Sequence, residues 1–153
     1  MKKILLAILF IGVAFSCEDE VYSNIPWAPV DLKLHLNGED NSLNGSLSYK
    51  IFIPNKDERT ATDKLGYGGI LVINGFGNDI LNLKAYDLSC PVHAERDVRI
   101  KPDKDGLNAT CPKCGATYNI ASSGAPISGS KYPLKQYNVI SSAGISGTYI
   151  VTN

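Results

Sequence analysis

The apolar residues of this chain recur at every second position over several short stretches. Within residues 31–36 the leucines alternate with polar residues, which predicts a strand with one buried face and leaves His35 on the opposite, solvent-facing side. Residues 47–53 alternate in the same way, and Pro54 ends that run because proline cannot donate to a sheet ladder. These stretches predict half-buried strands rather than helices.

Further apolar runs, bounded by glycine-rich or polar segments, predict the remaining strands. They cover residues 68–73, 80–86, 98–101, 107–110, 134–140 and 148–151. Residues 37–45 and 74–78 are expected to form polar loops or turns, and the charged residues 56–64 to hold at most a helical turn. No stretch predicts a helix longer than two turns, so we predict an all-β domain.

The N-terminal residues carry a targeting pattern rather than a folding pattern. Two lysines precede an apolar run over residues 4–15, as in a secretory signal peptide. Residues 14–17, Ala-Phe-Ser-Cys, resemble a bacterial lipobox, which implies cleavage before Cys17 and lipidation of its thiol. We therefore expect a signal peptide over residues 1–16 and a lipid anchor at Cys17. The alternative is an ordinary secretory signal with an incidental cysteine.

Residues 17–30 are expected to form a tether between the anchor and a domain that covers residues 31–153. Asparagine and prolines break any regular pattern in the tether, and Trp27 is expected to dock against the domain because tryptophan usually packs. The acidic residues 18–20 resemble an export signal of surface lipoproteins in some Gram-negative groups. The expected location is therefore the bacterial cell envelope, on the outer membrane or the cell surface.

The charge balance argues against several classes of partner. The 153 residues hold 15 basic and 15 acidic side chains, and removing the leader with its two lysines leaves 13 basic and 15 acidic ones, a net charge of −2. Neither nucleic acid nor an anionic membrane surface is expected to bind such a chain. No apolar run after residue 16 is long enough for a transmembrane helix, so we expect membrane attachment through lipidated Cys17.

Chemistry is concentrated in two short turns, Cys90-Pro-Val-His93 and Cys111-Pro-Lys-Cys114, separated by seventeen residues. Each turn is expected at a strand end, at the tip of a hairpin, so that the two tips meet. Paired turns with this separation are typical of four-ligand zinc ribbons. We predict one metal site with Cys90, His93, Cys111 and Cys114 as ligands. The same donors suit Zn²⁺, iron or a two-iron cluster.

The same residues allow other interpretations. Cys111 and Cys114 are spaced for a small disulfide or a redox dithiol, which would leave Cys90 unpaired. His93 is alternatively a surface histidine with no ligand role. Four polar residues flank the ligands and are expected to hydrogen-bond to them or to their backbone, namely Asp87, Ser89, Thr110 and Thr117.

Four segments of the chain resemble successive blocks of Rieske domains, in the family's order. They are residues 69–72, 85–91, 109–118 and 129–139. The similarity spans roughly residues 66–151 and implies an antiparallel β-sandwich, with a small two-hairpin metal-binding subdomain over about residues 86–120. The resemblance also implies a [2Fe-2S] cluster, one-electron transfer with a redox protein partner, and a third loop over residues 128–133 that covers the cluster.

The ligands depart from the Rieske pattern. Rieske loops read Cys-x-His and Cys-x-x-His, whereas the first turn here is one residue longer and the second ends in Cys114. A centre with two histidine ligands is excluded because His35 lies outside both turns. Three outcomes remain: a [2Fe-2S] cluster with three thiolates and one imidazole, whose potential the extra negative charge would lower; a structural Zn²⁺ site with the same ligands; or a scaffold that has lost its metal.

The sequence gives little support for an enzyme. It has two histidines, no Gly-x-Ser-x-Gly elbow, and glycines that no helix pattern follows, so neither a catalytic triad nor a phosphate loop is expected. No small-molecule substrate is evident. We therefore expect an electron carrier with a [2Fe-2S] cluster rather than a protein with its own catalytic site. The alternatives are a zinc-stapled interaction module on the cell envelope and a scaffold without metal.

Overall fold

Residues 21–76 and 81–153 are described by the computed structural model of the chain. The predicted signal peptide, the predicted lipidation site Cys17 and the acidic residues 18–20 therefore lie outside the described residues. So does part of the turn predicted over residues 74–78.

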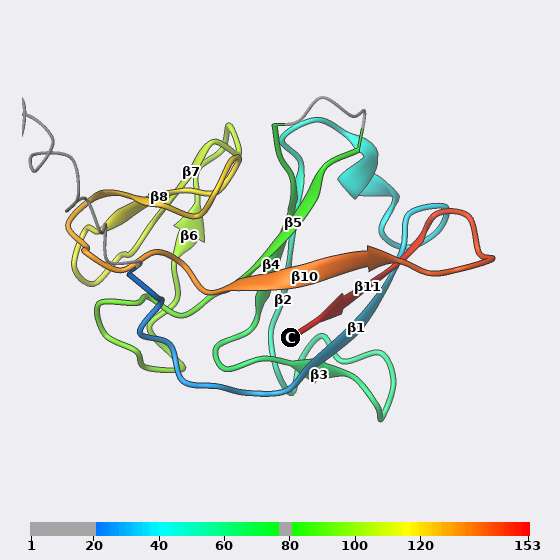
Figure 1. Cartoon of the computed structure of the whole chain (residues 1–153), viewed down its shortest axis with the longest axis horizontal. Coiled ribbons are helices and arrows are strands. Elements are labelled where there is room, and N and C mark those ends of the chain that lie inside the picture. The colour runs from blue at the N-terminus through cyan, green and yellow to red at the C-terminus, as the bar shows by residue number, and fades with distance from the viewer. Residues whose placement is uncertain (1–20, 77–80) are drawn as a thin grey trace, which may run out of the picture.

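Two antiparallel sheets make up the described fold, which confirms the all-β prediction (Figure 1). The larger sheet has the strand order β2-β4-β5-β10-β11-β1-β3 and the smaller one the order β6-β7-β8-β9. The larger sheet holds β1 (Val30–His35), β2 (Tyr49–Phe52), β3 (Lys64–Leu65), β4 (Ile70–Asn74), β5 (Leu83–Asp87), β10 (Gln136–Ser141) and β11 (Thr148–Thr152). The smaller sheet holds β6 (Lys101–Pro102), β7 (Asn108–Thr110), β8 (Thr117–Asn119) and β9 (Pro126–Ser128).

The alternation in β1 has the predicted consequence. Its residues are buried and exposed in turn, with Leu32 and Leu34 fully buried and His35 exposed. The strand pairs with β11, where Leu32 lies opposite Val151, and on its other side with the short β3. One face of this strand therefore covers the core, and the other meets water.

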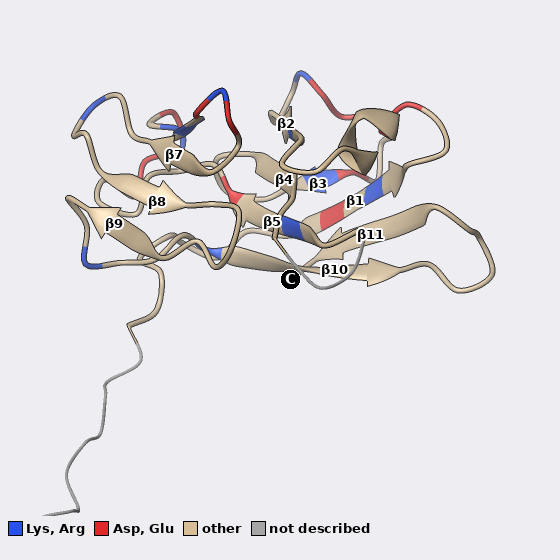
Figure 2. Ribbon diagram, turned by 90° about the horizontal axis from the view of Figure 1, so that it is seen from above, with Lys and Arg blue, Asp and Glu red and all other residues tan. Residues whose placement is uncertain are grey.

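Strand β4 lies between two hydrophobic cores, which explains why its five residues are all buried. Ile70 and Val72 point into the first core, which also contains the β1 leucines. Leu71 and Ile73 point to the opposite side, into the second core beneath the smaller sheet. Because side chains alternate along a strand, one continuous apolar run serves both cores. The second core thereby fixes the smaller sheet against the larger one (Figure 2).

Several segments differ from the sequence-based expectation. Residues 56–63 form turns rather than a helical turn, and Asn41–Asn44 forms a short 3-10 helix, η1, inside the predicted polar loop. The strand expected over residues 98–101 begins only at Lys101. Strand β9 was not predicted, because it is short and the surrounding sequence is rich in serine and proline. It forms because β8 supplies its hydrogen-bond partners.

The N-terminal described residues run along the domain before β1 begins. Ile25 and Ala28 are buried, and the Asn153 side chain accepts from the Val30 amide at 2.7 Å and donates to the Ala28 carbonyl at 3.1 Å. The packed domain thus includes residues that the sequence assigned to the tether. The expectation that Trp27 docks was wrong, since 73% of this residue is exposed.

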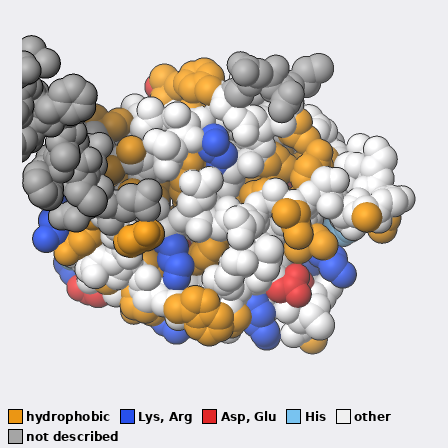
Figure 3. Space-filling view, viewed as in Figure 1, with side chains coloured by type: hydrophobic (Ala, Val, Ile, Leu, Met, Phe, Trp, Pro, Cys, Tyr) orange, Lys and Arg blue, Asp and Glu red, His pale blue; other side chains and the backbone are white. Residues whose placement is uncertain are grey.

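The surface carries hydrophobic side chains in several separate groups on the face shown in Figure 3, between polar and charged residues. Over the described residues, no helix has the length and apolar character needed to cross a bilayer.

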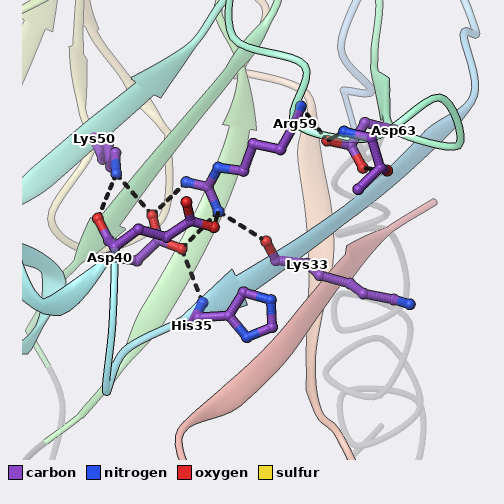
Figure 4. Close-up of polar contacts among 8 residues, drawn as sticks. Lys33, His35, Asp40, Lys50, Arg59 and Asp63 are labelled. Atoms are coloured by element: carbon purple, nitrogen blue, oxygen red, sulfur yellow. Dashed lines mark hydrogen bonds and ion pairs between the residues drawn. The ribbon is translucent and has the colours of Figure 1, made fainter.

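A buried carboxylate, that of Asp40, connects the loop after β1 to the end of β1, to β2 and to the loop around Arg59 (Figure 4). It accepts from Lys50 Nζ at 2.8 Å, from the Arg59 guanidinium at 2.6 Å and from the His35 amide at 2.8 Å. Burial alone would raise the pKa of Asp40, but the hydrogen bonds from Arg59 and Lys50 outweigh it and lower the pKa to about 2. Both cations also lie over the Phe52 ring. These contacts fix the loops that flank β1 and β2.

The Asp40 contacts predict an acid-sensitive part of the stability. Because the folded pKa of about 2 lies below the unfolded value, the ionised form stabilises the fold above about pH 4, and this stabilisation disappears as the pH falls towards 2. We expect a loss of about 2 kcal/mol in the free energy of unfolding of metal-free protein between about pH 5 and pH 2.5, measured by urea denaturation. Asp40→Asn should remove this part of the pH dependence, and an unchanged slope in that variant would contradict the assignment.

Candidate metal centre

The two cysteine turns occupy corresponding places in the fold. The first follows β5, where Ser89 forms a bridge to Arg99, and Cys90 comes next. The second connects β7 to β8, and the last residue of β7, Thr110, pairs with the first residue of β8, Thr117. The Cys111 amide donates to the Ala116 carbonyl at 2.8 Å and closes the hairpin tip. Each turn thus begins at a fixed strand end, as the sequence predicts.

The backbones of the two turns share one pattern. The Ala94 amide donates to the Cys90 carbonyl at 2.9 Å, and the Gly115 amide donates to the Cys111 carbonyl at 2.8 Å. Ala94 and Gly115, each directly after the second ligand of its turn, have φ values of 51° and 75° in the left-handed region. Glycine suits this conformation, and alanine adopts it at a cost. The turns therefore present their ligands in the same way although their sequences differ.

The four predicted ligand atoms converge. Cys90 Sγ lies 3.8 Å from Cys114 Sγ, and Cys111 Sγ lies 3.9 Å from His93 Nδ1. All four donors lie within 4.8 Å of one another. Two thiolates bound to one tetrahedral zinc ion at about 2.3 Å are about 3.8 Å apart. The four side chains are therefore positioned to bind a metal ion.

The site is buried on one side and open on the other. Cys90 and Cys111 are buried, His93 is half-buried and Cys114 is exposed. All three of these cysteines are free thiols, so the structure does not support the alternative in which Cys111 and Cys114 form a disulfide. The second histidine, His35, is exposed on β1. The turn tips are additionally linked by an exposed ion pair between Lys113 and Glu95 at 3.2 Å, a contact that contributes little.

The pKa values of the two buried thiols are shifted in opposite directions. Burial raises the pKa of Cys90 to about 11, because a thiolate loses its hydration there. Burial acts in the same direction on Cys111, but the backbone amides of Cys114 and Lys113 donate to its sulfur, and with the neighbouring thiols they lower its pKa. Amide donors aimed at a sulfur favour the thiolate, which is the form that binds metals.

Tyr118 is a neighbour of the site that the sequence analysis missed. Its hydroxyl lies 3.7 Å from Cys90 Sγ, its side chain is fully buried, and burial raises its pKa. The Ser130 side chain acts in the opposite direction and lowers the pKa of this hydroxyl. The signal in the sequence was the period-two spacing of residues 116, 118 and 120, in β8 and on both sides of it, which points all three into the second core.

Of the four flanking residues expected to hydrogen-bond to the ligands or their backbone, Thr117 bonds instead to the residue after Cys114. Its hydroxyl donates to the Gly115 carbonyl at 3.4 Å and shares a hydrogen bond with Ser128 Oγ at 2.9 Å, which links the second turn to β9. The Ser89 hydroxyl is buried without a partner among the described residues. For Thr110, the described hydrogen bonds include none from its hydroxyl to a ligand.

Asp87 acts on the backbone that leads to the site rather than on the ligands. Its fully buried carboxylate accepts from the amides of Tyr67 at 2.8 Å, Gly68 at 3.1 Å and Ser89 at 2.8 Å, and from Tyr137 Oη at 2.6 Å. These bonds fix the end of β5 just before the first ligand. Burial, together with the nearby carboxylate, raises the pKa of Tyr137, which therefore remains a hydroxyl donor.

Comparison of the chain with models of known protein families and with curated proteins finds no match. A metal centre is therefore indicated by the side-chain geometry and by the chemistry of the four donors.

The shared backbone of the two turns predicts how Gly115 responds to substitution. A Cβ at this residue would meet no atom within 4 Å, so Gly115→Ala should cost only the left-handed conformation, about 1 kcal/mol in the free energy of unfolding. Metal binding should persist, because Ala94 already takes this conformation in the first turn. Urea denaturation and metal analysis measure both quantities.

Ala94→Gly is the matched variant in the other turn and should not be destabilised by strain, because glycine adopts a positive φ freely. A Gly115→Ala protein that folds but binds no metal would contradict the equivalence of the two turns.

Proposed function

We propose that this protein is a metalloprotein in which Cys90, His93, Cys111 and Cys114 hold a single Zn²⁺ ion, in a domain of Rieske-like architecture that serves as an interaction module on the cell envelope. The observation that carries the proposal is the mutual separation of all four donor atoms, which is at most 4.8 Å. With four protein ligands the zinc shell is full, so the ion would stabilise the fold rather than catalyse a reaction.

The separations favour one ion over a cluster. Ligands of one ion are all mutual neighbours, whereas the ligands of a [2Fe-2S] cluster are divided between two irons, and donors on different irons lie further apart by about the iron–iron separation. Here each close pair, Cys90–Cys114 and Cys111–His93, takes one member from each turn. The 4.8 Å limit also applies across the two pairs, so the donors form one group.

A zinc ion would join two turns that the second core already brings together. Three thiolates and a neutral imidazole give the filled site a net charge of −1, and the amides of the second turn that donate to Cys111 compensate part of it. Because the unfolded chain has no preformed site, the binding free energy of the ion would contribute to folding. The ion would thereby stabilise the end of the domain that carries the smaller sheet.

A second candidate is one-electron transfer through a [2Fe-2S] cluster bound by the same four residues. It is favoured by the order of the segments that resemble Rieske blocks, and by the contact of the Tyr118 hydroxyl with Cys90 Sγ on the buried side of the site. A hydrogen bond to a ligand sulfur is one of the features that set a cluster potential. The exposed Cys114 would then lie at the surface that meets a redox partner.

The lipobox-like residues support a further part of the proposal. Acylation of Cys17 would hold the domain at a membrane without a spanning helix, because two or more acyl chains anchor a protein stably. We place the mature protein in the bacterial cell envelope on this basis.

Metal analysis separates the two candidates. The mature chain, purified without added metal, is expected to be colourless and to contain one zinc per chain, measured by elemental analysis and absorption spectroscopy. A coloured protein that contains two irons per chain and bleaches on reduction would replace the zinc proposal with the electron-transfer one. Absence of both metals would leave only the scaffold.

The two histidines provide a matched pair of variants for the ligand set. His93→Asn should weaken zinc binding by roughly a hundredfold or more, since changes outside the ligand set already cost about 10–100-fold. His35→Asn, on the exposed face of β1, should bind zinc as the unchanged protein does. Competition with a chromophoric chelator measures both affinities, and Cys114→Ser tests the exposed sulfur in the same way. Equal affinities for the two histidine variants would remove His93 from the site.

A further inference from the structure

The segment before β1 presents its large apolar side chains to the outside. Val21, Tyr22 and Trp27 are 50%, 76% and 73% exposed, whereas Ile25 and Ala28 in the same segment are buried. Side chains of this size normally pack when a neighbouring surface is available. The segment has such a surface and uses it for Ile25 and Ala28, so the outward position of the other three calls for an explanation.

The segment is held in place by specific contacts. Lys135 Nζ donates to the Pro26 carbonyl at 2.9 Å, and Asn24 Nδ2 donates to the Pro91 carbonyl at 3.5 Å. Together with residues 133–136 it borders an open hollow of about 440 Å³. Because these contacts and the bond from Asn153 to the Ala28 carbonyl hold the backbone on both sides of Trp27, the fold fixes the position of this residue on the surface.

The exposed residues lie close in the chain to the expected lipid anchor. Four peptide units separate Cys17 from Val21, and even fully extended they reach about 14 Å. Acyl chains on Cys17 would enter the hydrocarbon layer, so the start of the described chain cannot leave the neighbourhood of the lipid headgroups. Tryptophan and tyrosine are the residues that favour this zone, because each combines an apolar ring with a polar group.

We propose that Val21, Tyr22 and Trp27 form a membrane-contact surface that rests on the lipid bilayer beside the anchored Cys17. This inference rests on the lipidation of Cys17 and does not depend on which metal the site holds. The three side chains would bind a bilayer weakly on their own. The anchor makes the contact intramolecular, so a high effective concentration of lipid compensates for the small area.

The charge of this region predicts an apolar contact with lipid rather than an electrostatic one. The mature chain carries a net charge of −2, and three consecutive acidic residues, 18–20, lie between the anchor and the surface. Attraction to anionic lipids is therefore not expected, and the contact should be apolar and insensitive to salt.

The contact also orients the metal centre. Asn24 bonds to Pro91, the residue after the first ligand, so the metal-bearing end lies next to the membrane-contact surface. In Figure 1 the chain enters the domain at the end that carries β6, β7 and β8, and the β10–β11 hairpin lies at the opposite end. The metal-bearing end would accordingly face the bilayer, and the β10–β11 tip would face away from it.

The test uses Trp27, the only tryptophan of the chain, as its reporter. Full-length lipidated protein is reconstituted into phosphatidylcholine vesicles. Its emission should shift to the blue relative to a soluble form that begins at Glu18, and brominated phosphatidylcholine should quench roughly half of it, as expected for a ring at headgroup depth. The shift should remain in 1 M salt, where charge interactions are screened within about 3 Å.

A relocated tryptophan is the matched control. Ile145, 61% exposed at the β10–β11 tip, is replaced in the double variant Trp27→Phe, Ile145→Trp, which should emit as in water and escape quenching. Mass spectrometry reports the lipid on Cys17 in each protein. If Trp27 of a lipidated protein emits as in water, the proposed membrane contact is wrong and the lipid anchor stands. If its emission shifts to the blue without quenching, Trp27 packs against a protein partner, and the proposed membrane contact is again wrong. A chain with no lipid on Cys17 overturns the anchor and the contact surface together.

Discussion

A buried carboxylate, that of Asp87, ties three parts of the chain together where β5 leaves the large sheet. It accepts the amides of the Tyr67–Gly68 loop and of Ser89, and the hydroxyl of Tyr137 on β10. Leaving such a charge without its donors would cost several kcal/mol, so the donors and the backbone that carries them are held in one arrangement. The first ligand follows three residues later, and its position depends on this arrangement.

The two ligand turns show how one backbone shape is reached from two sequences. Both close with an amide-to-carbonyl bond across the turn, and both end in a left-handed residue, alanine in one and glycine in the other. The second core beneath them contains Cys90 and Cys111 as well as Tyr118, so the residues that begin each turn are part of the packed interior. The later ligands, His93 and Cys114, are less buried and complete the set from the outside. This asymmetry gives the centre one dry side and one side open to solvent.

The sequence was informative where local periodicity and burial agree. The alternating leucines of β1 and the continuous apolar run of β4 predicted strands, and the spacing of the cysteine turns predicted which four side chains meet. It was less informative where a segment's structure comes from its neighbours. Strand β9 forms on the edge of β8, and the loop around Arg59 is shaped by the buried Asp40 rather than by its own helix propensity.

By itself the sequence determined that the domain is built of strands and that its ligand-type residues occur in two turns, because period-two patterns and turn spacings are local properties of the chain. Tertiary structure alone decided how near the four donors come to one another, that Tyr118 touches the first sulfur, and that Asp87 serves the backbone instead of the ligands. It also decided that Ile25 is buried while Trp27 faces outward. Each of these depends on residues far apart in the chain packing against a common core, and such distances are not encoded in any single segment.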